Sequence, residues 1–135
     1  MSFKYGYYKE LCDHYLELLK PINKTNRFCD EEVLRRDFVS RSYYTALLHC
    51  RDNMDSLTDD YNGGTHEQII TSIENNSIEE DLRNLKALRV KADYHTVPFP
   101  APLKVKNTVV HLQRVNAIVN NILTKTKVDL LKSKM

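Results

Sequence analysis

Arg89 and His95 are the residues of this chain whose types and spacing best suit chemistry. Along a helix of about 100° per residue, Arg89 falls in an apolar row that covers roughly 80° of arc. The other members of the row are Ile78, Leu82, Leu85 and Ala92. Because a guanidinium is costly to bury without an anion or a carbonyl beside it, Arg89 needs either an internal carboxylate partner or an external anion such as a phosphate.

An arginine and a histidine can together cleave RNA without a metal ion, when the neighbouring 2′-hydroxyl attacks its own phosphate. The planar guanidinium matches phosphate oxygens, and the imidazole titrates near neutral pH and can move a proton. We interpret Arg89 as the phosphate clamp and His95 as the proton-transfer or orienting group. Asp93 would fix the arginine side chain in position.

Two other interpretations of these residues stay open. In the first, Arg89 is tied to Asp93 at i+4, to Asp37 or to another carboxylate, and His95 only ends the helix. In the second, a phosphate or nucleotide binds without turnover. Six residues place His95 about 120° around the helix from Arg89. The two therefore converge only if the helix ends before His95, which the nearby Pro98 allows, or if a second subunit supplies the partner.

Neighbouring residues extend this candidate site toward RNA. Lys86 and Lys91 can add nonspecific phosphate contacts. Tyr94, together with Tyr43 and Tyr44, can stack on bases. Tyrosines at these spacings also suit a core or an interface.

The other histidines are weaker candidates. His49 lies between the two apolar stripes of its helix and suits a structural role, and His66 lies in a helix-capping segment without a convincing partner. The histidines show no metal-ligand spacing, and the sequence has no glycine-rich phosphate loop and no Ser/His/Asp or Cys/His signature. We therefore expect neither a metal ion nor a cofactor.

The composition predicts one domain over residues 1–135, in the cytoplasm. A chain of 135 residues fits one core, and only three glycines and four prolines leave long segments that favour helices. No apolar run approaches the ~20 residues that cross a bilayer, and the N-terminus lacks the apolar segment of a signal peptide. Cys12, Cys29 and Cys50 form no Cys-x-x-Cys pair and suit reduced residues.

The net charge of +2 conceals an uneven distribution. Residues 52–81 hold nine acidic residues and no lysine or arginine, whereas residues 82–135 hold eleven basic residues against Asp93 and Asp129. This pattern fits either ordinary solvated faces or one electropositive side that attracts a polyanion.

The hydrophobic periodicity predicts an all-α fold, an up-and-down bundle of four to five helices. The expected ranges are about Tyr5–Lys20, Asp30–Leu57, Thr65–Glu74, a helix from Ser77 that carries Arg89, and about Lys104–Lys132. Thr65–Gln68 and Ser77–Glu80 match capping boxes. The second helix has two apolar faces, which indicates a central position in the bundle or an interface with a second chain.

Three segments of the chain are similar to those of a known family. They are Ser40-Arg-Ser-Tyr-Tyr-Thr-Ala-Leu-Leu-His-Cys-Arg51, Gly64-Thr-His-Glu-Gln-Ile-Ile70, and Leu85 to Tyr94, which ends in Leu-Arg-x-x-Ala-Asp-Tyr. In this order they resemble the Arg-Ser-Tyr-Tyr helix, the Thr-His segment and the closing helix of small stand-alone members of the HEPN superfamily. Together they span about residues 30–97.

The resemblance implies a four- or five-helix bundle that dimerises and, in many members, a metal-independent endoribonuclease. Arg89-x5-His95 matches the family signature of an arginine followed by four to six residues and a histidine, and in such enzymes the motifs of two subunits meet across the dimer. A toxin-antitoxin or phage-defence setting, with an antitoxin or another protein as partner, is likewise implied. Val90 stands where active members often carry a polar residue, so the alternative is a non-catalytic module that binds a partner protein, RNA or a nucleotide.

Overall fold

The computed structural model describes residues 6–26, 31–54, 65–94 and 108–131 of the chain. In these ranges the elements are α1 (Gly6–Leu18), the 3-10 helix η1 (Pro21–Asn26), α2 (Glu31–Asp52), α3 (Thr65–Thr71), α4 (Asn76–Tyr94), α5 (Thr108–Leu123) and α6 (Lys127–Leu131). No strand occurs among the described residues, which confirms the predicted all-α fold.

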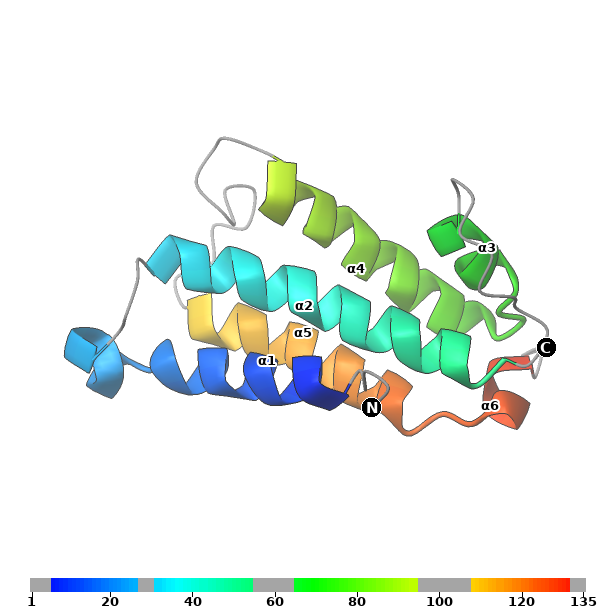
Figure 1. Cartoon of the computed structure of the whole chain (residues 1–135), viewed down its shortest axis with the longest axis horizontal. Helices are drawn as coiled ribbons and strands as arrows, with labels where there is room; N and C mark the ends of the chain where they lie inside the picture. The colour runs from blue at the N-terminus through cyan, green and yellow to red at the C-terminus, as the bar shows by residue number, and fades with distance from the viewer. Residues whose placement is uncertain (1–5, 27–30, 55–64, 95–107, 132–135) are drawn as a thin grey trace.

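Four long helices form the bundle, in the up-and-down order that the sequence predicts. Figure 1 shows α1, α2, α4 and α5 running along the long axis, each antiparallel to the one before it. Helix α2 packs against α1, α4 and α5. The short helices α3 and α6 lie at one end of the bundle (Figure 1).

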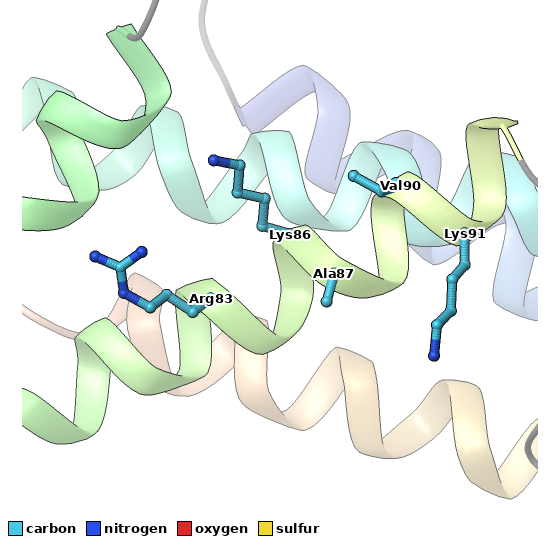
Figure 2. A pocket seen from close by; sticks show the side chains of 5 residues that line it. All are labelled: Arg83, Lys86, Ala87, Val90 and Lys91. Atoms are coloured by element: carbon cyan, nitrogen blue, oxygen red, sulfur yellow. The ribbon is translucent and has the colours of Figure 1, made fainter.

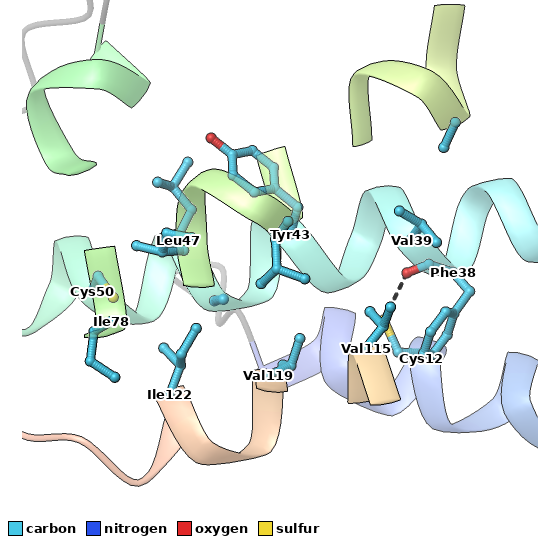
Figure 3. Close-up of a cluster of buried hydrophobic side chains, with 14 of the residues drawn as sticks. Cys12, Phe38, Val39, Tyr43, Leu47, Cys50, Ile78, Val115, Val119 and Ile122 are labelled. Carbon is cyan, nitrogen blue, oxygen red and sulfur yellow. Dashed lines mark hydrogen bonds between the residues drawn. The ribbon is translucent and has the colours of Figure 1, made fainter. Parts of the chain in front are cut away.

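Helix α2 occupies the central position because its apolar residues are spread around its whole circumference. Phe38, Val39 and Tyr43 are fully buried, and so are polar residues such as Thr45. Figure 3 shows the α2 side chains reaching toward Cys12 of α1, and toward residues of α4 and α5. The two apolar faces of this helix are thus accounted for within one chain.

The core takes one stripe from each outer helix. Each stripe follows the helical repeat, so that one face of the helix is buried and the other is in solvent. The buried members are Cys12, Tyr15 and Leu19 at α1, Ile78, Leu82, Leu85 and Ala92 on α4, and Leu112, Val115, Val119 and Ile122 on α5. The apolar row that holds Arg89 therefore faces the core, as its spacing predicts.

Several helix ends differ from the prediction. Helix α1 ends at Leu18, α2 at Asp52 and α3 at Thr71, each earlier than expected. Helix α4 begins at Asn76, because the Asn75 side-chain oxygen accepts the backbone N–H groups of Ser77 and Ile78. Asn75, and not the predicted Ser77–Glu80 box, is therefore the N-cap of this helix.

The predicted last helix is two helices in the structure. The chain turns after α5, where the Lys125 N–H donates to the Ile122 carbonyl. Thr126 precedes helix α6, and its backbone N–H and hydroxyl both donate to the Asp129 carboxylate, which supplies one half of a capping box. His49 of α2 lies 2.8 Å from the Lys125 carbonyl, through Nε2, and holds this turn against the bundle.

Helix α6 closes the end of the bundle where α4 begins. The buried Leu130 contributes its side chain to the core, and its carbonyl accepts the N–H groups of both Glu74 and Asn75. The Asn75 amide in turn donates to the Asp129 carbonyl. These bonds connect the start of α4 to the last described turn of the chain.

None of the described helices combines the length and the apolar character that crossing a membrane requires.

Candidate functional site

Arg89 lies on α4 with its side chain 17% exposed, and two groups orient it. Its Nε lies 2.9 Å from Oδ2 of Asp93, one turn along the same helix. The Nε hydrogen is not aligned with that oxygen, so the contact is an ion pair and not a hydrogen bond. On the other side, Nη2 donates to the Tyr44 hydroxyl of α2 at 2.9 Å.

Asp93 links α4 to the central helix α2 at this point. Its side chain is 27% exposed, and the oxygen that faces Arg89 also accepts the Ser40 hydroxyl of α2, at 3.3 Å. The carboxylate is the i+4 partner that the spacing predicts for Arg89. Arg89 therefore has an internal partner, which the structural interpretation requires. Its side chain is also fixed in position, which the functional interpretation requires.

Two aromatic rings lie near the guanidinium of Arg89. The Cζ atom of Arg89 lies 5.3 Å from the centre of the Tyr44 ring and 5.5 Å from that of Tyr94. Arg41 approaches the same Tyr44 ring at 5.9 Å. Cations at such distances are attracted by the ring faces. Tyr44 thus contacts two guanidinium groups, while Tyr94 is 67% exposed to solvent.

His66 is the residue that sequence reasoning left without a partner, and the structure gives it three contacts with two residues. Its Nδ1 lies 3.2 Å from the Tyr43 hydroxyl, and its ring lies 5.7 Å from the Tyr43 ring and 5.5 Å from the Tyr44 ring. Burial lowers the pKa of the imidazole, and the charges of Arg89 and Lys86 lower it further. The adjacent Tyr43 and Tyr44, with the Thr-His segment of the resemblance, are the sequence signals that could have indicated this cluster.

The last turn of α4 is held by an arginine of α2. Nη1 of Arg36 donates to the carbonyls of Ala92, at 2.8 Å, and Lys91, at 3.3 Å. The same side chain bonds Glu32 one turn earlier on α2. A cation at the C-terminal carbonyls of a helix stabilises that end. Arg36 therefore helps to position the segment that carries Arg89 and Asp93.

Charged groups tie α3 to α4 beside the site. The Glu67 carboxylate accepts hydrogen bonds from Nη1 of Arg83 at 2.8 Å and from Nζ of Lys86 at 3.3 Å. The Glu79 carboxylate lies 3.7 Å from Nη2 of Arg83. These bonds lower the pKa of the Glu67 carboxyl, with Arg83 as the larger cause. Part of the acidic segment thus meets part of the basic segment, so Lys86 does not lie on a purely electropositive side.

The outer face of α4 has a hollow of about 380 Å³. The residues that line it are Arg83, Lys86, Ala87, Val90 and Lys91. Figure 2 shows that Lys86 and Lys91 point in opposite directions from the helix. The cations around this apolar floor therefore do not converge on one point. They suit several contacts along a chain of phosphates better than they suit a single bound ion.

The remaining histidine predictions concern His95 and His49. His95 and the proline-rich connector at 98–102 lie outside the described residues, and α4 is helical up to Tyr94. The buried His49 holds the turn before α6, which matches its expected structural role. Among the described residues, His, Cys, Asp and Glu side chains form no group of three that could hold a metal ion.

The thiols of the described cysteines are unsuited to nucleophilic chemistry. Cys12 and Cys50 are free and buried. Burial raises the pKa of the Cys50 thiol to about 12 and also raises that of Cys12. A thiol that stays protonated is a poor nucleophile.

Comparisons with known families, with curated proteins and with solved structures gave no match. The candidate site is thus defined by its geometry. Residues 40–51, 65–70 and 85–94 are the described parts of the three segments that carry the sequence resemblance, and they meet in space. Tyr43 and Tyr44 come from the first segment, His66 from the second and Arg89 from the third.

Proposed function

We propose that this chain is a HEPN-like bundle that cleaves RNA without a metal ion, with Arg89 as the phosphate clamp. The observation that carries the proposal is the guanidinium of Arg89, which Asp93 and Tyr44 orient and which lies within 5.5 Å of the centres of two tyrosine rings. A fixed cation beside rings that can stack on bases suits a phosphodiester of unpaired RNA.

The Asp93 ion pair leaves Arg89 able to bind a phosphate. A guanidinium has five N–H donors. Within the described part of the chain, one of them bonds the Tyr44 hydroxyl and the Nε group faces Asp93. The remaining donors have no protein partner among the described residues, so a phosphate can take them. The negative charge that develops in the transition state would strengthen those bonds.

The residues around Arg89 provide further contacts. The exposed Tyr94 ring offers a stacking surface, and Lys86 and Lys91 flank the hollow on the same helix. Lysines that contact phosphates bind without regard to sequence. In this proposal His95 transfers a proton or orients the substrate next to Arg89.

We also propose that two copies of the chain pair through α4. Val90 is 37% exposed and lines the hollow on the outer face of α4, where it offers an apolar contact. In the enzymes that the sequence resembles, the arginine and histidine motifs of two subunits meet across the dimer. The expected setting is the cytoplasm, in a toxin-antitoxin or phage-defence system with a protein that silences the site.

The test is cleavage of bulk tRNA and of a mixed-sequence RNA in the presence of EDTA. Wild-type protein should cleave, and Arg89→Ala should reduce the rate by about 100-fold or more, the size expected for one electrostatic group. His95→Ala should be similarly impaired. Arg114→Ala, at an exposed arginine of α5, is the matched control and should keep the wild-type rate. A wild-type protein that leaves both RNAs intact overturns the proposal.

A second candidate function is favoured by the Arg89–Asp93 ion pair itself, because a purely structural arginine would adopt the same contact. In that case the chain is a non-catalytic module that binds a partner. RNA that stays intact but binds in an Arg89-dependent manner would identify an RNA-binding module. Neither cleavage nor binding would identify a protein-binding one.

A further inference from the structure

We propose that His66 is the general base of the Arg89 site and takes the proton of the attacking 2′-hydroxyl. This inference rests on the proposed RNA cleavage and adds a catalytic residue from the same chain. In this inference His66 deprotonates the attacking 2′-hydroxyl, and His95 protonates the departing 5′-oxygen.

Tyr44 contacts both His66 and Arg89. Its hydroxyl accepts Nη2 of Arg89 at 2.9 Å, and its ring meets the His66 ring edge-on at 5.5 Å. A phosphate held by the guanidinium would therefore lie beside the imidazole.

Tyr43 fixes the direction of the ring. Its hydroxyl lies 3.2 Å from Nδ1, so within the described residues Nε2 is the ring nitrogen that has no protein partner. The proposal requires the tautomer in which Nδ1–H donates to the Tyr43 oxygen and Nε2 carries the lone pair. Tyr43 is fully buried, and burial raises the pKa of its hydroxyl, so it stays neutral beside the imidazole.

The surroundings of His66 favour its neutral form, which is the form that a base needs. The charged groups that act on it are Arg89 and Lys86, both of α4, and both are cationic. Together with burial they disfavour the imidazolium. At neutral pH the ring is therefore unprotonated and ready to accept a proton.

The reaction balances without a further reactant. The 2′-oxygen forms a bond to phosphorus while its proton moves to Nε2 of His66. The bond between phosphorus and the 5′-oxygen breaks, and that oxygen takes a proton from His95. The products are a 2′,3′-cyclic phosphate and a 5′-hydroxyl, and both histidines return to their starting forms through exchange with water.

The experiment compares His66→Asn with His14→Asn, which changes an exposed histidine of α1. Two RNA substrates are used in EDTA, one natural and one with sulfur in place of the 5′-oxygen at a single position. Sulfur can leave without being protonated. The sulfur substrate should therefore restore cleavage by a variant that lacks the general acid, but not by a variant that lacks the general base. His66→Asn should lose about 100-fold or more with both substrates, whereas His95→Ala should recover with the sulfur substrate.

Folding of the variant is checked separately. His66→Asn should keep the helical circular dichroism of the wild type and its affinity for an RNA that carries a 2′-deoxy nucleotide at the cleaved position. Added imidazole should restore part of the activity of a His66→Gly variant. The matched His14→Asn protein should cleave both substrates at the wild-type rate.

The outcomes separate this inference from the proposed function. Wild-type cleavage together with full activity of His66→Asn overturns the inference and leaves the nuclease intact. Recovery of His66→Asn by the sulfur substrate assigns His66 to the departing oxygen and overturns its role as base. A wild-type protein that cleaves neither substrate overturns both proposals.

Discussion

Arg89 is oriented by contacts of two kinds, one along its own helix and one between helices. The ion pair with Asp93 follows from i,i+4 spacing, so the sequence alone predicts it. The bond to Tyr44 joins residues 45 positions apart, and no periodicity indicates it. The same holds for His66, whose neighbours come from α2 and α4. Local spacing thus predicted one half of the candidate site, and tertiary packing made the other half.

At the residue scale, His66 should make the stability of the fold depend on pH. Its pKa in the folded protein lies below the ordinary 6.5, because of burial first and of Arg89 and Lys86 next. The unfolded chain therefore binds the proton more readily, and the free energy of unfolding falls as the pH drops below about 6.5. Urea unfolding at several pH values should show a smaller fall in His66→Asn than in the wild type.

His14→Asn is the control for this measurement, since an exposed histidine should leave the wild-type slope unchanged. A steeper fall in His66→Asn than in the wild type would mean that the imidazole is charged in the folded protein. That result would also exclude His66 as a base at neutral pH.

At the element scale, α4 depends on its N-cap. Asn75 is 8% exposed, accepts the N–H groups of Ser77 and Ile78, and donates to the Asp129 carbonyl. Asn75→Ala should lower the free energy of unfolding by about 1–2 kcal/mol. Chemical denaturation measures this loss. Asn76→Ala, at the exposed first residue of the helix, should change stability by less than about 0.5 kcal/mol, and equal losses in the two variants would contradict the assignment.

The helix ends show where sequence patterns compete. Ser77-x-x-Glu80 matches a capping box, yet Asn75 lies two residues earlier and forms the cap. Thr126-x-x-Asp129 is also a capping signal, but it lies within an expected helix whose apolar repeat continues on both sides. Periodicity therefore predicted the long helices and their buried faces. The turn before α6 also depends on His49, which is distant in sequence and so gives no local signal.

At the scale of the whole molecule, the separate acidic and basic blocks of the sequence partly neutralise each other. Glu67 and Glu79 of the acidic block pair with Arg83 of the basic block, and Glu67 also pairs with Lys86. Exposed pairs of this kind contribute little to stability. Their effect is to reduce the local positive charge near α3, so affinity for RNA should depend on Arg89, Lys91 and Tyr94 more than on net charge.

The proposed pairing of two chains through α4 makes a prediction about mass in solution. Wild-type protein at micromolar concentration should sediment with twice the chain mass of 15.8 kDa. Val90→Glu places a charge in the proposed contact and should give the single-chain mass, because an unpaired charge is costly to bury. Val33→Glu, at a valine of α2 that is 54% exposed, should stay paired. A wild-type protein of single-chain mass would contradict the pairing.

The two bonds that Leu130 accepts have a consequence for shortened forms of the protein. Proteolytic trimming that removed the chain from Lys127 onward would leave the amides of Glu74 and Asn75 without an acceptor and would withdraw Leu130 from the interior. The damage would appear at the start of α4, far along the chain from the cut. Loss of α6 would therefore disturb the helix that carries Arg89 without altering any residue near that arginine.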